Sequence, residues 1–333
     1  MRKARHMAGP ALAAAMLVLG CAGPDLRLRR GTAPDEDLLA LLPAGAEAVL
    51  DIQTETLRGV PGTDRLVAAF PQALGALAED PLADLEDLAV SITGLGTEQV
   101  QAVLLARGRP SWIRLSAALR QGGTAVTEVD YHGTWVLEQP QGRAAAMITP
   151  RTAVLGSPMA VRQVIDNARH ETDGVRGQRD LLAALARAPG AKQGRPAVRG
   201  ALLPPPPLRQ RLREADLGEF GADADFIALA LAAGDGIDLG VVAGFRQLET
   251  ARAVCQRIRE RLDRLRQGPL VSLFRLQPYF DPIILVAALA GPDRRSPELH
   301  LAYRLPGEEL AALVARIDRI RELWATARRT GAK

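Results

Sequence analysis

The chain has 333 residues, and its 47% hydrophobic and 24% charged content is ordinary for a soluble globular protein. Its 42 lysines and arginines exceed its 38 acidic residues, but three of these basic residues stand within the first five positions. Without residues 1–20 the basic count falls by three to 39, against the same 38 acids. Basic and acidic side chains are then nearly equal in number, and a chain without excess positive charge is not expected to bind nucleic acid.

The start of the chain has the pattern of an export signal. Basic residues precede an apolar run from Ala11 to Leu19, which ends at Gly20 and Cys21. The run is too short for a transmembrane helix, which needs about 20 apolar residues. Its end, Val18-Leu19-Gly20-Cys21, resembles the lipobox of bacterial lipoproteins, with Leu19 at a position where Ala or Ser is commoner.

The resemblance implies a processed and acylated amino terminus. In bacterial lipoproteins the signal peptide, here residues 1–20, is cut off before the cysteine, and the cysteine receives acyl chains such as palmitate. Cys21 would therefore be the lipid attachment site, and residues 21–37 a lipidated terminus and flexible tether. Ala22, where Asp would favour retention, resembles lipoproteins sent to the outer membrane. The implied location is the outer membrane, facing the periplasm.

Strand and helix patterns alternate through residues 38–172, which we predict to form a first half of the fold. The predicted elements are, in chain order, strand Ala46–Ile52, helix Thr63–Leu77, strands Leu88–Ile92 and Val100–Ala106, helix Ser111–Arg120, strands Ala125–Tyr131, Thr134–Glu138, Ala144–Ile148 and Thr152–Leu155, and a helix from Ser157 to Ala168.

Residues 173–207 are less patterned, and we predict that they connect this half to a second half at 208–333. The predicted elements of the connector are helix Arg179–Ala188, a strand near Val198–Leu203 and a rigid polyproline segment at Pro204–Pro207. Those of the second half are strands Phe226–Ala232 and Ile237–Phe245, helix Leu248–Gln267, strands Ile283–Leu289 and Leu299–Leu305, and helix Glu308–Ala327.

The two halves repeat one order of elements with little sequence identity. An internal duplication explains this order, but a chance match of helix–sheet alternation explains it too, and the halves could also form one continuous domain. Long helices segregated against antiparallel meanders predict an α+β fold, with antiparallel sheets covered by helices, rather than a doubly wound sheet.

The residues that could carry chemistry form no recognisable site. His132 stands in a turn, His170 near a helix end and His300 on a strand, and no two histidines have the spacing of metal ligands. Acidic clusters at residues 79–87 and 223–225 are interpreted as helix-start charges and solvated turns. We therefore predict no catalytic residue, no metal site and no cofactor, with a triad assembled across the fold as the alternative.

The predicted helix Leu248–Gln267 combines an apolar stripe with a basic surface. If Cys21 carries lipid, Cys255 on this apolar stripe has no disulfide partner, so we predict a buried thiol. The arginines of this surface are Arg252, Arg257, Arg259, Arg261, Arg264 and Arg266. They could contact a membrane or an acidic partner, or form the solvated face of a helix packed on the core.

Three functional hypotheses follow. The first is a membrane-anchored envelope lipoprotein with a non-enzymatic binding or scaffolding role, held by its N-terminal lipid and contacting an envelope protein. The second is a carrier of a lipid or another apolar ligand, because a curved sheet covered by helices can enclose an apolar pocket. The third is an envelope hydrolase.

Overall fold

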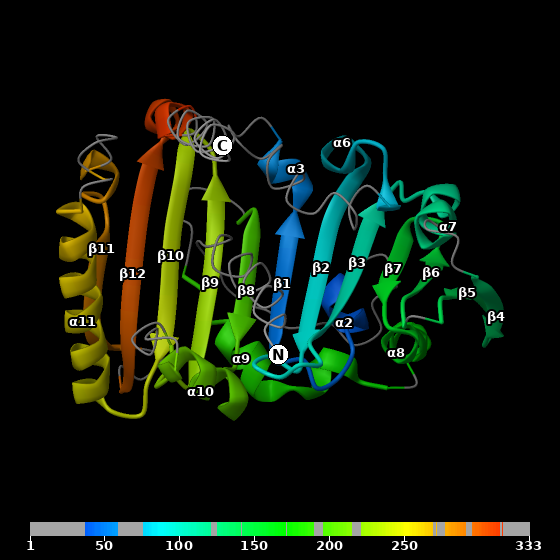
Figure 1. Ribbon diagram of the computed structural model, residues 1–333, viewed down its shortest axis with the longest axis horizontal. Coiled ribbons are helices and arrows are strands. Elements are labelled where there is room, and N and C mark those ends of the chain that lie inside the picture. Colours follow the sequence, from blue (N-terminus) through cyan, green and yellow to red (C-terminus); the bar gives the residue numbers. More distant parts are fainter. Residues whose placement is uncertain are drawn as a thin grey trace, which may run out of the picture.

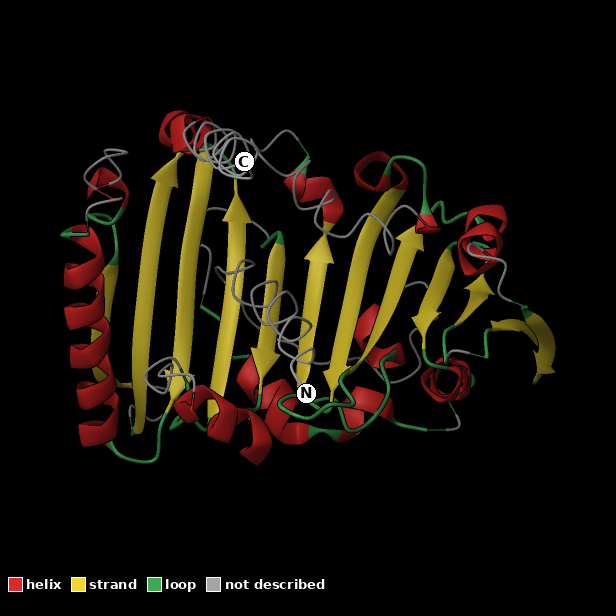
Figure 2. Cartoon of the chain, in the orientation of Figure 1, coloured by secondary structure: helices red, strands yellow, loops and turns green. Residues whose placement is uncertain are grey.

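The computed structural model places a single sheet at the centre of the protein (Figure 1). It describes residues 37–58, 76–120, 125–140, 142–170, 172–189, 196–214, 221–268, 271, 277–290, 295–313 and 315. Twelve antiparallel strands form this sheet, and helices pack on both of its faces (Figure 2), so the α+β prediction is confirmed.

The strands form one continuous sheet. They are β1 (Ala48–Gln53), β2 (Leu85–Thr93), β3 (Gln101–Gly108), β4 (Thr127–Tyr131), β5 (Thr134–Glu138), β6 (Ala144–Thr149), β7 (Thr152–Gly156), β8 (Val198–Leu202), β9 (Phe226–Ala233), β10 (Gly236–Gly244), β11 (Ile284–Ala290) and β12 (Ser296–Pro306). Their order is β11-β12-β10-β9-β8-β1-β2-β3-β7-β6-β5-β4, so β11 and β4 are the two edges.

Helices connect the strands. They are α2 (Leu38–Leu41), α3 (Thr54–Leu57), α6 (Pro81–Asp84), α7 (Trp112–Arg120), α8 (Pro158–Ala168), α9 (Arg179–Leu185), α10 (Pro206–Glu214) and α11 (Leu248–Arg266), with 3₁₀ turns η1 (Gly174–Gly177) and η3 (Gln277–Tyr279). Residues 307–313 are helical, as predicted, and most of the predicted helices Thr63–Leu77 and Glu308–Ala327 lie outside the described residues. Within the described part of the chain, none of the helices has the length and apolarity needed to span a membrane.

The two halves of the sheet have similar strand connectivity, but four strands (β4 to β7) follow α7 in the first half and two (β11 and β12) follow α11 in the second. From the centre, β1, β2 and β3 follow one another outward, and β7 returns after α7 to pair with β3. In the other direction β8, β9 and β10 follow one another outward, and β12 returns after α11 to pair with β10. β1 and β8 pair antiparallel in the middle.

The strand predicted near Val198–Leu203, within residues 173–207, is β8. The segment does more than connect two halves, because it supplies β8, the central strand on which the second half is built. β8 forms ladders with β1 on one side and β9 on the other, so the two halves share one sheet.

Each face of the sheet has its own core. Residues paired directly across neighbouring strands share a face, and we name the two faces after the helices that cover them. On the α8 face, α2, α8 and α9 pack on Val49, Ala89, Leu105, Val154 and Ala201. On the α11 face, α7 packs on Leu88, Ala106, Leu137 and Ala153, and α11 packs on Leu285 and Leu299.

The proline-rich segment differs from the prediction of a rigid polyproline rod. Pro206 and Pro207 form the first turn of α10. A proline is tolerated there because its missing N–H would have no helical acceptor in any case. Leu208 of α10 is buried and packs with Leu95 from the turn between β2 and β3, which fixes this helix against one end of the sheet.

Candidate binding site at the α11 edge of the sheet

Helix α11 forms one side of the candidate site. Its sequence favours a helix because buried residues recur at intervals of three and four, at Ala251, Val254, Cys255 and Ile258. Glu249 in the first turn and two arginines in the last turn match the helix dipole. The buried stripe packs on β11 and β12, and the prediction of a buried, unpaired Cys255 is confirmed.

The six arginines predicted as one basic surface do not all act together. Arg252 and Arg264 are exposed, and Arg257 lies 3.7 Å from Asp223, away from the sheet edge. Arg259 and Arg266 instead turn toward the strand side of the helix. The Nη2 atom of Arg259 donates to the Leu285 carbonyl at 2.7 Å, and that of Arg266 donates to the carbonyl preceding the strand, on Phe280, at 2.7 Å.

A cleft of about 340 Å³ opens between α11 and β11. Apolar and charged side chains line it in equal number: Leu262, Ile283 and Leu285, and Arg259, Asp263 and Arg266. Asp263 accepts from Arg266 Nη1 at 3.3 Å. The Nε atom of Arg266 is buried without a hydrogen-bond acceptor among the described atoms. The cleft therefore combines an apolar floor with two guanidinium groups about two helical turns apart.

The adjoining edge strand β11 exposes apolar side chains. None of its seven residues, Ile284 to Ala290, is charged. Ile284 is 62% exposed, Val286 47% and Leu289 49%. The opposite edge, β4, carries Glu128 and Asp130 on five residues. Natural sheets commonly protect their edges with charges and short strands, so β4 is protected in this way and β11 is not.

The histidines lie in two regions, His300 on β12 and both His132 and His170 near the C-terminal end of α8. His300 Nε2 is 3.0 Å from the Glu298 carboxylate on β12, and Glu298, only 3% exposed, also pairs with Arg187 beyond the end of α9. His132 has a φ of 53° in the turn between β4 and β5 and lies 3.9 Å from Asp166. His170 follows α8 with a φ of 60°. The fold therefore brings His132 and His170 to the same end of α8, where Arg169 Nη1 donates to the His132 carbonyl at 2.9 Å.

Asp80 has the predicted helix-start role, whereas Glu86 and Asp87 lie on strand β2 and form ion pairs. Asp80 is the N-cap of α6 and accepts from the Ala83 N–H. Asp84, Glu86 and Asp87 pair with arginines on neighbouring segments, namely Arg109, Arg151 and Arg107. Across the described residues, no group of three or more His, Cys, Asp or Glu side chains is arranged to hold a metal ion.

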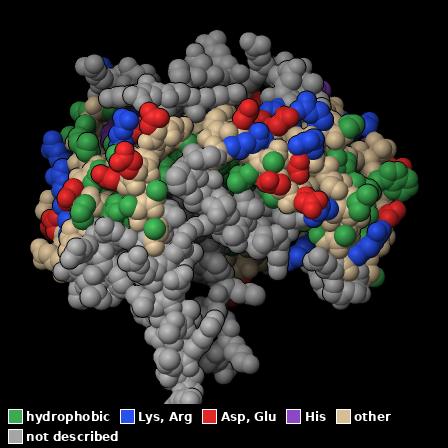
Figure 3. All heavy atoms as spheres, turned by 90° about the horizontal axis from the view of Figure 1, so that it is seen from above, with side chains coloured by type: hydrophobic (Ala, Val, Ile, Leu, Met, Phe, Trp, Pro, Cys, Tyr) green, Lys and Arg blue, Asp and Glu red, His purple; other side chains and the backbone are tan. Residues whose placement is uncertain are grey.

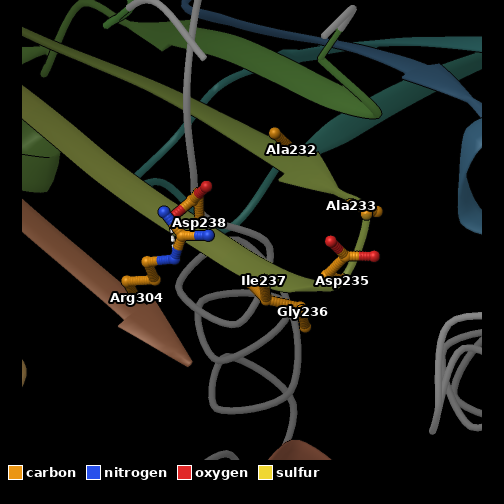
Figure 4. Close-up of a pocket in the computed structure, with 8 residues that line it drawn as sticks. Ala232, Ala233, Asp235, Gly236, Ile237, Asp238 and Arg304 are labelled. Carbon is orange, nitrogen blue, oxygen red and sulfur yellow. Dashed lines mark ion pairs between the residues drawn. The ribbon is translucent and has the colours of Figure 1, made fainter. Parts of the chain in front are cut away.

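A second hollow lies at the turn between β9 and β10 (Figure 4). Its volume is about 30 Å³, and it is lined by the turn Gly234-Asp235-Gly236 and by Asp238 and Arg304. The Arg304 Nε atom lies 3.6 Å from Asp238 Oδ1 across β12 and β10. A hollow of this size holds about one water molecule, so it cannot enclose a substrate.

Charges of both signs are interspersed over the described part of the surface seen in Figure 3. That view shows no broad field of one sign that would attract a polyanion. The apolar edge β11 combines exposed apolar side chains with neighbouring arginines, and we take this edge and its cleft as the candidate site.

No protein-family model matches the chain, and no curated protein matches it. A solved structure, described as crystal form III of TP0453, is similar with a TM-score of 0.46 and 10% sequence identity. The similarity covers 83% of this chain and 96% of that one.

Sequence reasoning missed the importance of two features. The sequence pattern predicted a strand at the uncharged run Ile284–Ala290, but the position of this strand at an edge depends on the order of strands in the sheet. Arg187 had no local signal at all, because its partner Glu298 is 111 residues away. Cys21, the predicted lipid attachment site, lies outside the described residues.

Proposed function

We propose that this protein is a lipid-anchored bacterial envelope protein whose folded domain has a non-enzymatic binding role. The attachment rests on the motif Val18-Leu19-Gly20-Cys21 and its resemblance to a lipobox. The described fold begins at Asp37, which caps the buried helix α2. The residues between Cys21 and Asp37 reach up to about 50 Å if extended. Acyl chains on Cys21 would therefore hold the domain near a membrane, proposed to be the outer membrane on its periplasmic side.

The observation that carries the binding role is the exposed, uncharged edge strand β11. Many charged side chains elsewhere have structural partners that join elements of the fold. Arg199 pairs with Asp51 at 2.6 Å across β8 and β1, and Arg187 pairs with Glu298. These pairs hold segments of the fold together. We base the binding role on the β11 edge and its cleft, where exposed apolar side chains adjoin Arg259 and Arg266.

The cleft favours a second candidate function, the binding of a lipid or another apolar ligand. Its apolar floor of Leu262, Ile283 and Leu285 would contact an acyl chain, and Arg259 would contact an anionic head group. Half of its lining residues are charged, and the cleft lies at the surface beside the edge strand. A protein partner uses the edge strand as well as the cleft, so we favour the protein partner.

Attachment is tested by mass spectrometry of the mature amino terminus and by membrane fractionation of variants. We expect a mature chain that begins at an acylated Cys21, and release of Cys21→Ser into the soluble fraction. Cys255→Ser is the matched control and should stay with the membrane, because that thiol is buried in the α11 core. Equal membrane retention of Cys21→Ser and wild type would contradict lipid anchoring.

A further inference from the structure

The two edges of the sheet differ in how they meet solvent. β4 has five residues, two of them acidic, and Glu128 pairs with Arg120 of α7 at 3.0 Å. β11 has seven residues without a charge. In an edge strand, alternate residues present backbone N–H and C=O groups to the open side. The β11 edge thus offers both hydrogen-bonding backbone and apolar side chains to an additional strand.

We propose that β11 receives an extended segment of a partner protein as an added strand, with acidic side chains on the α11 side and apolar side chains on the α8 side. This proposal rests on the binding role proposed above and specifies its partner. Strand addition to an exposed edge, beside a helix that lines a groove, is a recurrent mode of peptide recognition.

The side-chain pattern follows from the two faces of β11. Leu285 belongs to the core under α11, where Arg259 and Arg266 line the cleft. Ile284 and Val286 alternate with Leu285 and therefore point to the opposite, α8 face, where they are exposed. An added strand has the same alternation, so its residues beside the arginines should be acidic and the residues between them apolar.

Charge also distinguishes this partner from a second copy of the chain. Helix α11 carries six arginines and three acidic residues, Glu249, Glu260 and Asp263. Pairing of β11 with β11 of another copy would bring two such positive helices close together on one face of the joined sheet. Like charges in that arrangement repel, whereas an acidic strand is attracted to the Arg259 and Arg266 side of the edge.

The test uses the full chain carrying Cys21→Ser, so that binding in solution is independent of lipid attachment. The probe is a fluorescein-labelled seven-residue peptide in which glutamate and valine alternate, and the control peptide has lysine in place of glutamate. Fluorescence anisotropy should show saturable binding of the glutamate peptide. The lysine peptide should bind at least about tenfold more weakly.

Two variants locate the site. Arg259→Glu should weaken binding of the glutamate peptide by about tenfold or more, and Val286→Lys should weaken it similarly by placing a charge on the apolar side of the edge. Arg264→Glu is the matched control on the same helix, because Arg264 is exposed and lies five residues from Arg259, on another side of the helix. It should change the affinity less than twofold. Circular dichroism and urea midpoints equal to those of the parent chain show that the variants are folded.

Several outcomes would overturn the inference. These are no binding of the glutamate peptide up to about 1 mM, equal binding of both peptides, or equal loss with Arg264→Glu and Arg259→Glu. Concentration-dependent dimerisation that Val286→Lys abolishes would assign the edge to a second copy instead. Binding to vesicles of anionic phospholipid, without peptide binding, would assign the arginines to a lipid head group. None of these results affects the Cys21 fractionation test.

Discussion

Replacing Arg187 with alanine removes the main cation beside a buried carboxylate. Arg187 follows α9, and its guanidinium pairs with Glu298 of β12. Glu298 is only 3% exposed, and its other partner is His300, with Nε2 at 3.0 Å. The pair joins the segment before β8 to strand β12, and its two residues are 111 positions apart in the sequence. Its loss leaves a charge in a place with little access to water.

The expected cost is about 3 kcal/mol of unfolding free energy. Removing one partner of a buried ion pair costs about 3–5 kcal/mol because the other charge stays buried. The lower end applies because the Arg187 side chain is 21% exposed and His300 remains next to the carboxylate. In a Glu298→Gln background the same arginine replacement should cost only about 1 kcal/mol, since a neutral amide needs no cation.

Urea unfolding at pH 7 of the four chains in this double-mutant cycle measures the coupling between the two positions. Arg120→Ala is the control for loss of an exposed pair, with Glu128 at 3.0 Å, and should cost less than about 1 kcal/mol. If Arg187→Ala costs the same with glutamate and with glutamine at position 298, the arginine does not offset the buried charge. That result would refute the reasoning.

Three further changes probe other parts of the fold. Gly96→Ala should lower the urea midpoint strongly, because the new Cβ would lie 2.2 Å from the Leu208 backbone nitrogen. Gly133 also has a positive φ but has open space around it, so Gly133→Ala should lower the free energy of unfolding by only about 1 kcal/mol. Burial raises the pKa of the Asp37 carboxyl above its ordinary value, with Arg176 partly opposing the shift. The folded state therefore binds this proton more tightly than the unfolded state does, and the ionised carboxylate lowers the stability of the folded state at pH 7. Asp37→Asn keeps a capping oxygen, so it should raise the free energy of unfolding at pH 7, and the gain should vanish near about pH 3. A loss of stability at pH 7 would contradict this. The Cys255 thiol should react with an aromatic disulfide reagent only after unfolding, and fast reaction of the native chain would show that the thiol is accessible.

Local patterns predicted the elements whose signals lie within a few residues. The helix predicted at Leu248–Gln267 is α11, Leu248–Arg266, because its apolar spacing and the following Gly268 act locally. The helix expected after Ser157 begins at Pro158, and the Ser157 hydroxyl accepts from the Ala160 N–H at 3.4 Å. The hairpin around His132 and Gly133 is β4–β5. In each case backbone preference and capping decide the structure within one or two turns.

Long-range pairing could not be predicted in the same way. A run such as Val198–Leu202 indicates a strand, but nothing in it says that β1 and β9 will be its neighbours. The prolines at 206 and 207 fit a rigid rod or the first turn of a helix equally well. Packing of Leu208 against Leu95 at the end of the sheet favours the helix. Such choices depend on contacts between residues far apart in the chain.

The candidate site likewise has features that local sequence predicts and features that depend on long-range contacts. The sequence by itself carries the motif on which export and lipid attachment are proposed, and it predicted the basic character of α11 and the burial of Cys255, because each depends on spacing within about twenty residues. Only the tertiary structure decided that Ile284–Ala290 is an edge, that Arg259 and Arg266 turn toward it, and that Arg187 holds Glu298. The physical reason is that a strand is an edge only when no other strand pairs with its second side. Strand pairing depends on the packing of the whole sheet.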